Sequence, residues 1–489
     1  MNQKADFGPD IDWKCEDKGR LWRYNLHYFQ YLHHSGLMES SLAGKLIKHW
    51  ISHNPPGTPD AWDPFPVSLR LVNWIKYLSQ AHIDTRTFIP CIRSAYSQAL
   101  WLEHSIEWHL LANHLFKNIK ALIFAGLFFK GHDAKRWLRK GLSLLEKELY
   151  EQILPDGGHF ERSPMYHSMI LEDCLDLLNI FYCSEEPAVR PFVEKLENVS
   201  KKMIEFLVYM IHPDGQIALF NDAAFGIEPL PADLFNYYKI VTGEEKCFPN
   251  GYFRTFPQSG YYVMSPASGD KMIIDCGPIG PDYQPGHAHC DLLSFELSID
   301  HKRIIVDSGC YGYEESPIRH YNRGNVGHNT LTIDNRNQSE VWGAHRCARR
   351  AYPLFADIKK EDGNRIVFEG AHDGYKRLPG HPIHYRKVHW DENMITIEDN
   401  IKGEGCHLIE SLLHIHPDFS VKLEQNKVFL QGECGNVLSI SPLKFGNLEI
   451  TEGWYCPEFG LKLVCPVVRM RFGSANLPFR AGWRLEILN

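Results

Sequence analysis

The spacing of apolar residues changes character near the middle of this 489-residue chain. In the first half, apolar residues recur at i, i+3, i+4 and i+7, which is the spacing of an amphipathic helix. Short breaks rich in Pro, Gly and Asp separate the periodic segments, and helices joined by short loops are typical of a helical bundle, solenoid or toroid. The spacing predicts helices at residues 68–80, 93–111, 114–130, 134–153, 168–181 and 192–211.

After residue 260 the apolar runs become short, alternating, and rich in β-branched or aromatic residues. Turn signals separate these runs every ~8–12 residues, a pattern typical of an antiparallel β-sandwich. We therefore predict a helical domain at residues 1–248 and an antiparallel β-sandwich domain at residues 249–489. The runs predict strands at residues 261–264, 271–274, 294–297, 303–306, 329–333, 365–369, 394–397, 407–414, 437–441, 469–471 and 483–487.

Composition excludes several classes of protein. Apolar residues make up 44% and charged residues 23% of the chain, so a large core is available. With 52 Lys and Arg against 60 Asp and Glu, the net charge of −8 argues against nucleic-acid binding through overall charge. We expect no membrane segment and no export signal, hence a cytoplasmic protein, or a periplasmic or secreted one if the chain is trimmed. The 13 cysteines have no C-x-x-C spacing, which predicts mostly reduced, buried thiols.

The densest group of chemically active residues is the segment Gly-His-Ala-His-Cys-Asp at residues 286–291. In a strand, His287 and His289 would point to the same face, because side chains repeat every two residues. Asp307 and His328 follow within polar, Gly-containing segments. Two imidazoles with an Asp and a His from neighbouring strands can form a metal site, and the alternative is a polar strand edge without metal.

Three further groups combine polar and aromatic residues. Asn113 and His114 fall where one predicted helix ends and another begins, so they either face a cleft or cap the helix. Tyr166 begins a helix, and it can exchange protons only if neighbouring groups stabilise its phenolate; otherwise it is a packed aromatic residue. Residues 62–74, with residues 22–29 upstream, suit either sugar stacking or the packed wall of a helical barrel.

Together these groups make the chain similar to the heparinase II/III-like polysaccharide lyases over nearly its whole length. The most specific pieces are Asn113-His114, the Arg-Ser-Pro-Met-Tyr-His segment at residues 162–167, residues 286–291, and Asp307 with residues 327–330. The resemblance implies an incomplete (α/α) toroid followed by an antiparallel β-sandwich. It also implies β-elimination of polysaccharides that contain uronic acid, either glycosaminoglycans (hyaluronan, chondroitin or heparan sulfate) or alginate and bacterial exopolysaccharides.

The resemblance also assigns catalytic roles. A lyase removes the proton at C5 of a uronic acid and protonates the glycosidic oxygen that leaves from C4. Asn113 is expected to stabilise the substrate carboxylate, and Tyr166 to protonate the leaving oxygen. Tyr166, His114 and His287 stay alternatives for the base, because the C5 protons of glucuronic and iduronic acid lie on opposite faces of the sugar.

The same resemblance implies a metal site and a basic cleft. The ligands of some family members map onto His289, Asp307 and His328, with zinc, or else manganese, in a structural role. Lys117 stands where some members carry a Glu, which favours an anionic polysaccharide or oligosaccharide as the partner. An acidic chain needs a local basic cleft for such a polymer. The residues expected to bind substrate are Arg70, Lys117, Arg162, His167, Trp62, Arg319 and Arg323.

Two other classes of protein are left as alternatives. A glycoside hydrolase of the (α/α) toroid type needs two carboxylates beside the bond, for which Glu161, Asp222 and Asp63 are candidates without a recognisable motif. A non-catalytic polysaccharide-binding protein would not need an amide, a phenol and an imidazole together. The sequence makes no prediction of oligomeric state.

Overall fold

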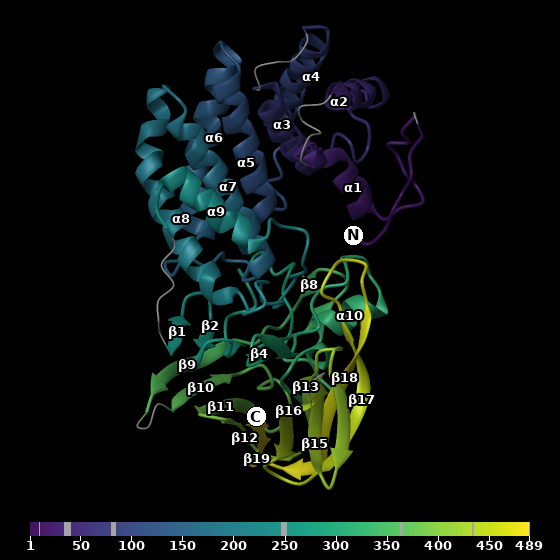
Figure 1. Ribbon diagram of the computed structural model, residues 1–489, viewed down its shortest axis with the longest axis vertical. Coiled ribbons are helices and arrows are strands. Elements are labelled where there is room, and N and C mark those ends of the chain that lie inside the picture. The colour runs from purple at the N-terminus through teal and green to yellow at the C-terminus, as the bar shows by residue number, and fades with distance from the viewer. Residues whose placement is uncertain are drawn as a thin grey trace. The chain divides into compact units, whose positions relative to one another are not determined.

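The structure is a computed structural model that describes residues 1–488 except residues 9, 34–40, 80–84, 246–251, 362–364 and 433–434. Up to residue 245, nearly all regular secondary structure in this part of the chain is helical (Figure 1). The helices are α1 (Arg20–Tyr28), α2 (Ser41–His53), α3 (Pro64–Leu78), α4 (Thr85–His104), α5 (Ala112–Phe128), α6 (His132–Gln152), α7 (Pro164–Tyr182), α8 (Arg190–Met210) and α9 (Pro231–Thr242), with short 3-10 turns at Gln30–His33 and Pro187–Val189.

One predicted helix is too long. The apolar pattern extends to residue 111, whereas α4 ends at His104. Residues 105–111 instead form tight turns, in which the backbone N–H of Leu111 donates to the carbonyl of Glu107. Leu111 has a φ of 58° and a ψ of −153°, which lie outside the helical region, so no helix continues through this residue. Local backbone geometry therefore overrides the apolar spacing at this point.

The later part of the described chain forms antiparallel sheets. Four sheets have the strand orders β1-β2-β3-β4-β5, β14-β15-β16-β19-β12-β11-β10-β9, β17-β18-β13-β6 and β7-β8. A short helix, α10 (Pro317–Arg323), and a 3-10 turn, η3 (Asn325–Gly327), interrupt them. The strands are β1 (Phe253–Phe256), β2 (Tyr261–Met264), β3 (Lys271–Asp275), β4 (Phe295–Ile299), β5 (Lys302–Ile305), β6 (Leu331–Ile333), β7 (Val341–Trp342), β8 (Arg346–Cys347), β9 (Pro353–Lys360), β10 (Ile366–His372), β11 (Ile383–Asp391), β12 (Met394–Lys402), β13 (Cys406–His414), β14 (Ser420–Glu424), β15 (Lys427–Gly432), β16 (Gly435–Pro442), β17 (Asn447–Tyr455), β18 (Leu463–Asn476) and β19 (Phe479–Ile487).

Side-chain alternation explains how these sheets form a core. Every second residue of β11 is buried, as expected for a strand with one face against the core. Buried apolar residues of the five-, eight- and four-stranded sheets join in one cluster that includes Phe295, Trp390 and Val468. The prediction of helices followed by antiparallel sheets is confirmed at this level.

The described chain divides into two compact units, each of which is considered by itself. The helical unit comprises Gln3–Gln152 and Asp173–Val199, and the sheet unit comprises Met1–Asn2, Ile153–Glu172 and Ser200–Asn489. Tyr166 therefore belongs to the sheet unit although it lies on α7. The predicted domain boundary at residues 248 and 249 lies outside the described residues.

Two expectations about the chain's environment concern membranes and thiols. No helix in the described ranges has both the length and the apolar character of a membrane span. The cysteines in these ranges are free thiols and most of them are buried, which agrees with the prediction from their spacing.

Candidate active site

Tyr166 and His287 lie side by side in the sheet unit. Helix α7 begins at Pro164, and the backbone N–H of Tyr166 donates to the hydroxyl of Ser163, so the phenol projects from the first turn. The ring centroids of Tyr166 and His287 are 4.2 Å apart. The Tyr166 hydroxyl lies 2.7 Å from the hydroxyl of Tyr313, within hydrogen-bond distance. The structure therefore brings together two of the predicted catalytic residues and adds Tyr313.

The surroundings of Tyr166 keep its phenol protonated. Burial raises the pKa of this phenol well above its usual value, and the negative charges of Glu161 and Asp222 raise it further. A phenol in this state can give a proton to a leaving oxygen. The proton-donor role expected for Tyr166 is therefore chemically consistent with its environment.

His287 and His289 share one carboxylate and do not lie on a strand, which corrects the sequence prediction. Residues 286–291 belong to a loop between β3 and β4. The loop is fixed by backbone contacts with Asn221 and Asp222, because the Asp222 N–H donates to the His287 carbonyl and the His289 N–H donates to the Asn221 side chain. Asp222 accepts from His287 Nδ1 at 2.8 Å and from His289 Nε2 at 2.9 Å, one histidine on each oxygen.

Asp222 is the charged centre of the site. Burial alone would raise the pKa of Asp222, but Arg319 and the two histidines hold it well below its usual range. Both terminal nitrogens of Arg319 donate to the two oxygens of Asp222. Because an ionised carboxylate accepts from His287 Nδ1, the proton of neutral His287 sits on Nδ1 and its Nε2 is left able to accept a proton.

Sequence reasoning missed three residues of this cluster or misread their roles. Asp222 was considered only as a hydrolase carboxylate, although the polar Asn-Asp pair at residues 221–222 interrupts an apolar run. Tyr313 follows Asp307 within a Gly-rich segment, where no motif distinguishes it from the nearby Tyr311. The ring of His345 lies 6.1 Å from that of His287, on the loop between β7 and β8.

His289, Asp307 and His328 form a buried group next to Asp222. Asp307 follows β5 and His328 follows η3, and His328 Nδ1 lies 2.7 Å from an Asp307 oxygen. One ligand atom of each residue lies within 4.8 Å of the others. His289 Nδ1 and His328 Nε2 are buried and form no hydrogen bond among the described residues. Two orphaned imidazole nitrogens beside a carboxylate are a donor set that fits a divalent metal, with Asp222 orienting His289.

The helical unit holds the other two catalytic candidates, Asn113 and His114. Both lie in the first turn of α5, which confirms the predicted helix junction, and the N-cap position is Leu111, not Asn113. The Asn113 side chain is 2% exposed. His114 Nδ1 lies 3.1 Å from Glu107 Oε1, so a carboxylate orients this imidazole as well. The Glu107 partner was not foreseen, because residue 107 lies in the segment that was assigned to α4.

The substrate-binding candidates of the helical unit are buried, which corrects their expected position along an open basic cleft. Arg70 is 0% exposed, donates to Gln98 and stacks 3.9 Å above the Trp50 ring. Lys117 forms a 2.8 Å ion pair with Asp173. The Trp62 indole donates to a backbone carbonyl. Apart from Arg70 Nη2, which forms no hydrogen bond among the described residues, these polar groups find partners inside the unit, as buried donors and acceptors generally do.

The same correction applies to the candidates of the sheet unit. Arg162 is part-buried and donates to the carbonyls of Phe160, Gln258 and Ser259, so it braces loops. His167 Nε2 lies 3.0 Å from the Met203 carbonyl. Arg319 donates to both oxygens of Asp222. The buried Arg323 donates to the backbone carbonyls of Ala288, Gly343 and Arg346. Guanidinium groups with five N–H donors are suited to this bracing role.

Comparison with known proteins gives matches over almost the entire chain. The family model Heparinase II/III N-terminus matches residues 2–249, and Heparinase II/III-like, C-terminal matches residues 249–468. A heparin-sulfate lyase of Bacteroides stercoris is 25% identical over 459 residues, which are 81% of this chain and 65% of the relative. A heparin-sulfate lyase of Pedobacter heparinus is 26% identical over 497 residues, 91% of this chain and 71% of the relative. The chain thus spans about two thirds of the length of these relatives.

A solved structure gives the same result for the fold. The crystal structure of a heparinase III superposes with a TM-score of 0.75 at 20% identity, and the match covers 99% of this chain and 80% of that one. At this level of identity the likeness shows a shared fold.

Proposed function

Because the chain belongs to the heparinase II/III family, we propose that it is a polysaccharide lyase acting on polymers that contain uronic acid. The expected substrates are glycosaminoglycans such as heparan sulfate, hyaluronan or chondroitin, and two relatives are named heparin-sulfate lyases. The observation that carries the proposal is the protonated Tyr166 phenol packed against the His287 ring. The contact of His287 Nδ1 with Asp222 leaves Nε2 of this histidine able to accept a proton.

The proposed reaction is a β-elimination. A base removes the C5 proton, the electron pair forms the C4–C5 double bond, and the C4–O bond breaks as Tyr166 protonates the leaving oxygen. The alternative bases are His287 Nε2, His114 and Tyr166, matched to the face on which the C5 proton lies. Tyr166 acts as the base once His287 Nε2 has taken its phenolic proton, and it then passes the C5 proton to the leaving oxygen. The Asn113 amide stabilises the charge that develops on the substrate carboxylate. Such acid–base catalysis typically contributes ~10²–10⁴-fold.

The metal and the domain architecture form part of the same proposal. His289, Asp307 and His328 would hold a divalent ion, zinc or manganese. A bound ion would link the loop at residues 286–291 to the segments after β5 and η3, a structural role. The two parts of the chain would be an incomplete (α/α) toroid and an antiparallel β-sandwich, divided near residue 249, where the two family matches meet.

The hydrolase alternative has less support. A hydrolase needs a protonated carboxyl as acid, whereas Arg319 and two histidines hold the pKa of Asp222 well below its usual range. Asp63 accepts from Tyr24 and Arg20 in the helical unit. These contacts commit two of the three candidate carboxylates to other partners.

The proposal is tested by incubating the protein with heparan sulfate, hyaluronan, chondroitin sulfate and alginate. A lyase produces the ultraviolet absorbance of an unsaturated uronate. Tyr166→Phe should abolish this signal without changing the circular dichroism spectrum, whereas Tyr150→Phe, at a 91% exposed tyrosine, should retain it. Full activity of Tyr166→Phe contradicts the mechanism. New reducing ends without the absorbance would indicate hydrolysis, and binding without either signal a non-catalytic role.

A further inference from the structure

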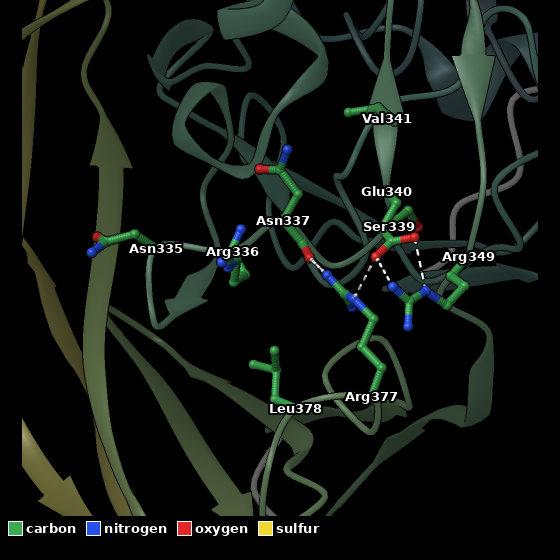
Figure 2. Close-up of a pocket in the computed structure, with 9 residues that line it drawn as sticks. All are labelled: Asn335, Arg336, Asn337, Ser339, Glu340, Val341, Arg349, Arg377 and Leu378. Atoms are coloured by element: carbon green, nitrogen blue, oxygen red, sulfur yellow. Dashed lines mark hydrogen bonds and ion pairs between the residues drawn. The ribbon is translucent and has the colours of Figure 1, made fainter.

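The sheet unit contains a cavity of about 460 Å³ beside the β7–β8 hairpin, which the catalytic proposal does not use. Its walls include three arginines, Arg336, Arg349 and Arg377, and one carboxylate, Glu340 (Figure 2). We call it the arginine cavity. Three guanidinium groups facing one carboxylate leave a net charge of +2 in a chain whose overall charge is −8. The cavity is therefore suited to an anion.

The charges of the cavity are unequally engaged. Arg349 Nε and Nη2 lie 2.8 and 2.6 Å from the two oxygens of Glu340, a two-point ion pair that neutralises this carboxylate. Arg377 is fixed by donation to the carbonyls of Asn337, Gln338 and Gly374, and its Nε lies 3.7 Å from Glu340.

Arg336 differs from these two arginines. It is exposed, and no side-chain hydrogen bond or ion pair connects it to another residue in the described ranges. Figure 2 shows Glu340 joined to both Arg349 and Arg377, whereas no interaction links Arg336 to the other residues drawn. The Arg336 guanidinium can therefore bind a ligand without breaking a hydrogen bond or ion pair within the described protein.

The remaining walls suit a sugar better than a small inorganic anion. Asn335 brings an exposed amide side chain, which can donate to and accept from hydroxyl groups, whereas the Asn337 amide oxygen already accepts from the Asn325 backbone N–H. Leu378 and Val341 add apolar surface that can contact the C–H face of a sugar ring. A guanidinium is suited to a carboxylate or a sulfate because its planar N–H pairs bind two oxygens at once. The lining thus combines the groups that recognise an acidic sugar.

The cavity is connected to the candidate active site through one short hairpin. Glu340 and Val341 line the cavity at one end of the hairpin, and His345 at its loop lies 6.1 Å from His287. His345 lies five positions after Glu340 in the chain, so their Cα atoms are at most about 18 Å apart. Arg319, which holds Asp222, also donates to the Ala344 carbonyl in the same loop. A polymer bound at His287 can therefore reach the cavity with a few sugars.

We propose that the arginine cavity binds an acidic sugar of the same polyanionic polymer, several units away from the bond that is cleaved. The proposal rests on the proposed function for the identity of the polymer, but not for the binding itself. Two sites joined by one chain act together, so a long oligosaccharide gains affinity that a short one cannot. The cavity would then set the preferred chain length of the substrate.

The test measures binding, so that it does not depend on catalysis. Calorimetry on a Tyr166→Phe background compares heparan sulfate, hyaluronan and alginate oligosaccharides of about four and about ten sugars. Arg336→Ala should weaken the binding of the long oligosaccharides by roughly three- to tenfold and leave the short ones unchanged. Arg336→Lys should restore part of the loss, because it keeps the charge without the planar fork.

Arg484→Ala is the matched control, because Arg484 is an exposed arginine on β19 that does not line the cavity. It should leave both lengths unaffected. The proposal is overturned if Arg336→Ala and the parent bind long oligosaccharides equally. It is also overturned if Arg336→Ala loses as much affinity for short oligosaccharides as for long ones, or if none of the three polymers binds. Displacement by sodium sulfate alone, without any length effect, would reveal a simple anion site and also overturn it. Length-dependent binding, together with no unsaturated uronate from the parent protein and any of these polymers, would reject the lyase function and retain the cavity.

Discussion

At the scale of the residue, Asp222 is the link between the candidate catalytic group and the candidate metal group. One of its oxygens meets His287 and the other meets His289, while Arg319 supplies the balancing charge. This arrangement fixes which nitrogen of each imidazole is free. The sequence could not predict it, because Asp222 lies 65 residues before His287 and the contact depends on tertiary folding.

Replacing Asp222 should therefore destabilise the protein strongly. Asp222→Asn leaves the Arg319 guanidinium buried without a counter-charge, and removal of one partner from a buried ion pair typically costs about 3–5 kcal/mol. The expected result is a clear fall in the midpoint of urea unfolding. Asp282→Asn removes an exposed partner of Arg350 and should cost about 0–1 kcal/mol. Equal urea midpoints for the two variants would show that the contacts of Asp222 do not stabilise the fold in this way.

The metal group yields a second prediction at this scale. His289→Ala should lower the content of bound divalent metal measured by mass spectrometry, because it removes one of the two orphaned imidazole nitrogens. His320→Ala, at an exposed histidine of the same unit, should leave the metal content unchanged. Unchanged metal in His289→Ala would remove this residue from the ligand set. Chelation should also lower the melting temperature of the parent protein and not that of the variant.

At the scale of the element, the spacing of apolar residues predicted the helices and strands whose positions depend on burial against a core. Helices α5, α6 and α8 and strands β2 and β3 match the predicted segments to within about two residues. Helix α6 buries one face, whereas α5, β2 and β3 are buried almost throughout, and both patterns leave a clear apolar signal in the sequence. The loop at residues 286–291 was missed because contacts from outside the segment fix it, whereas the end of α4 was missed because local backbone turns follow it. Sequence also does not show whether an arginine binds a substrate or a buried carbonyl, and Arg162 and Arg323, expected along the basic cleft, donate to carbonyls in this structure.

The ion pairs between α5 and α7 show why a substitution suggested by the family resemblance should destabilise this chain. Asp173, fully buried on α7, receives both Lys117 and Lys120 from α5. Lys117→Glu would install the acidic residue that some family members carry at this position. Within this chain it places a carboxylate against Asp173 and removes one of its cations.

We expect Lys117→Glu to destabilise the protein by about 3–5 kcal/mol, the usual penalty for an uncompensated buried charge. Thermal unfolding followed by circular dichroism measures the effect. Lys130→Glu makes the same charge change at an exposed position after α5 and should shift stability by less than about 1 kcal/mol. If the two variants unfold together, Lys117 is not a structural cation.

At the scale of the whole molecule, the overall charge proved a poor guide to the site. The net charge of −8 led to an expectation of a basic cleft, yet most of the basic residues expected there neutralise buried acids or brace backbone carbonyls. The unengaged positive charge found next to the hairpin belongs to Arg336, which no motif indicated. Family membership, in contrast, was predictable from a few short motifs, because these motifs contain the chemically active residues and do not depend on the overall charge.

Buried histidines make stability depend on pH in both units. Burial lowers the pKa of His27 to about 3, with Arg70 adding to the effect, and lowers the pKa of His167 to about 4. His27 Nδ1 accepts the Trp50 indole N–H, which protonation of that nitrogen would break. Above the unfolded pKa of about 6.5, neither state binds a proton and the stabilisation is complete. As pH falls below 6.5 the unfolded chain binds protons first, so stability is lost until the folded pKa is reached.

Comparison of His27→Gln with the parent isolates one of these groups. Other groups act in the opposite direction, since burial raises the pKa of Glu228 to about 8, so the difference between the two proteins is the informative quantity. Between about pH 6.5 and pH 5, the parent should lose about 2 kcal/mol more than His27→Gln, because glutamine cannot titrate while its amide oxygen can still accept from Trp50. Urea unfolding across this range measures the difference. His132→Gln, at an 88% exposed histidine, should follow the parent at every pH, and a His27→Gln curve parallel to the parent would show that His27 already titrates normally in the fold.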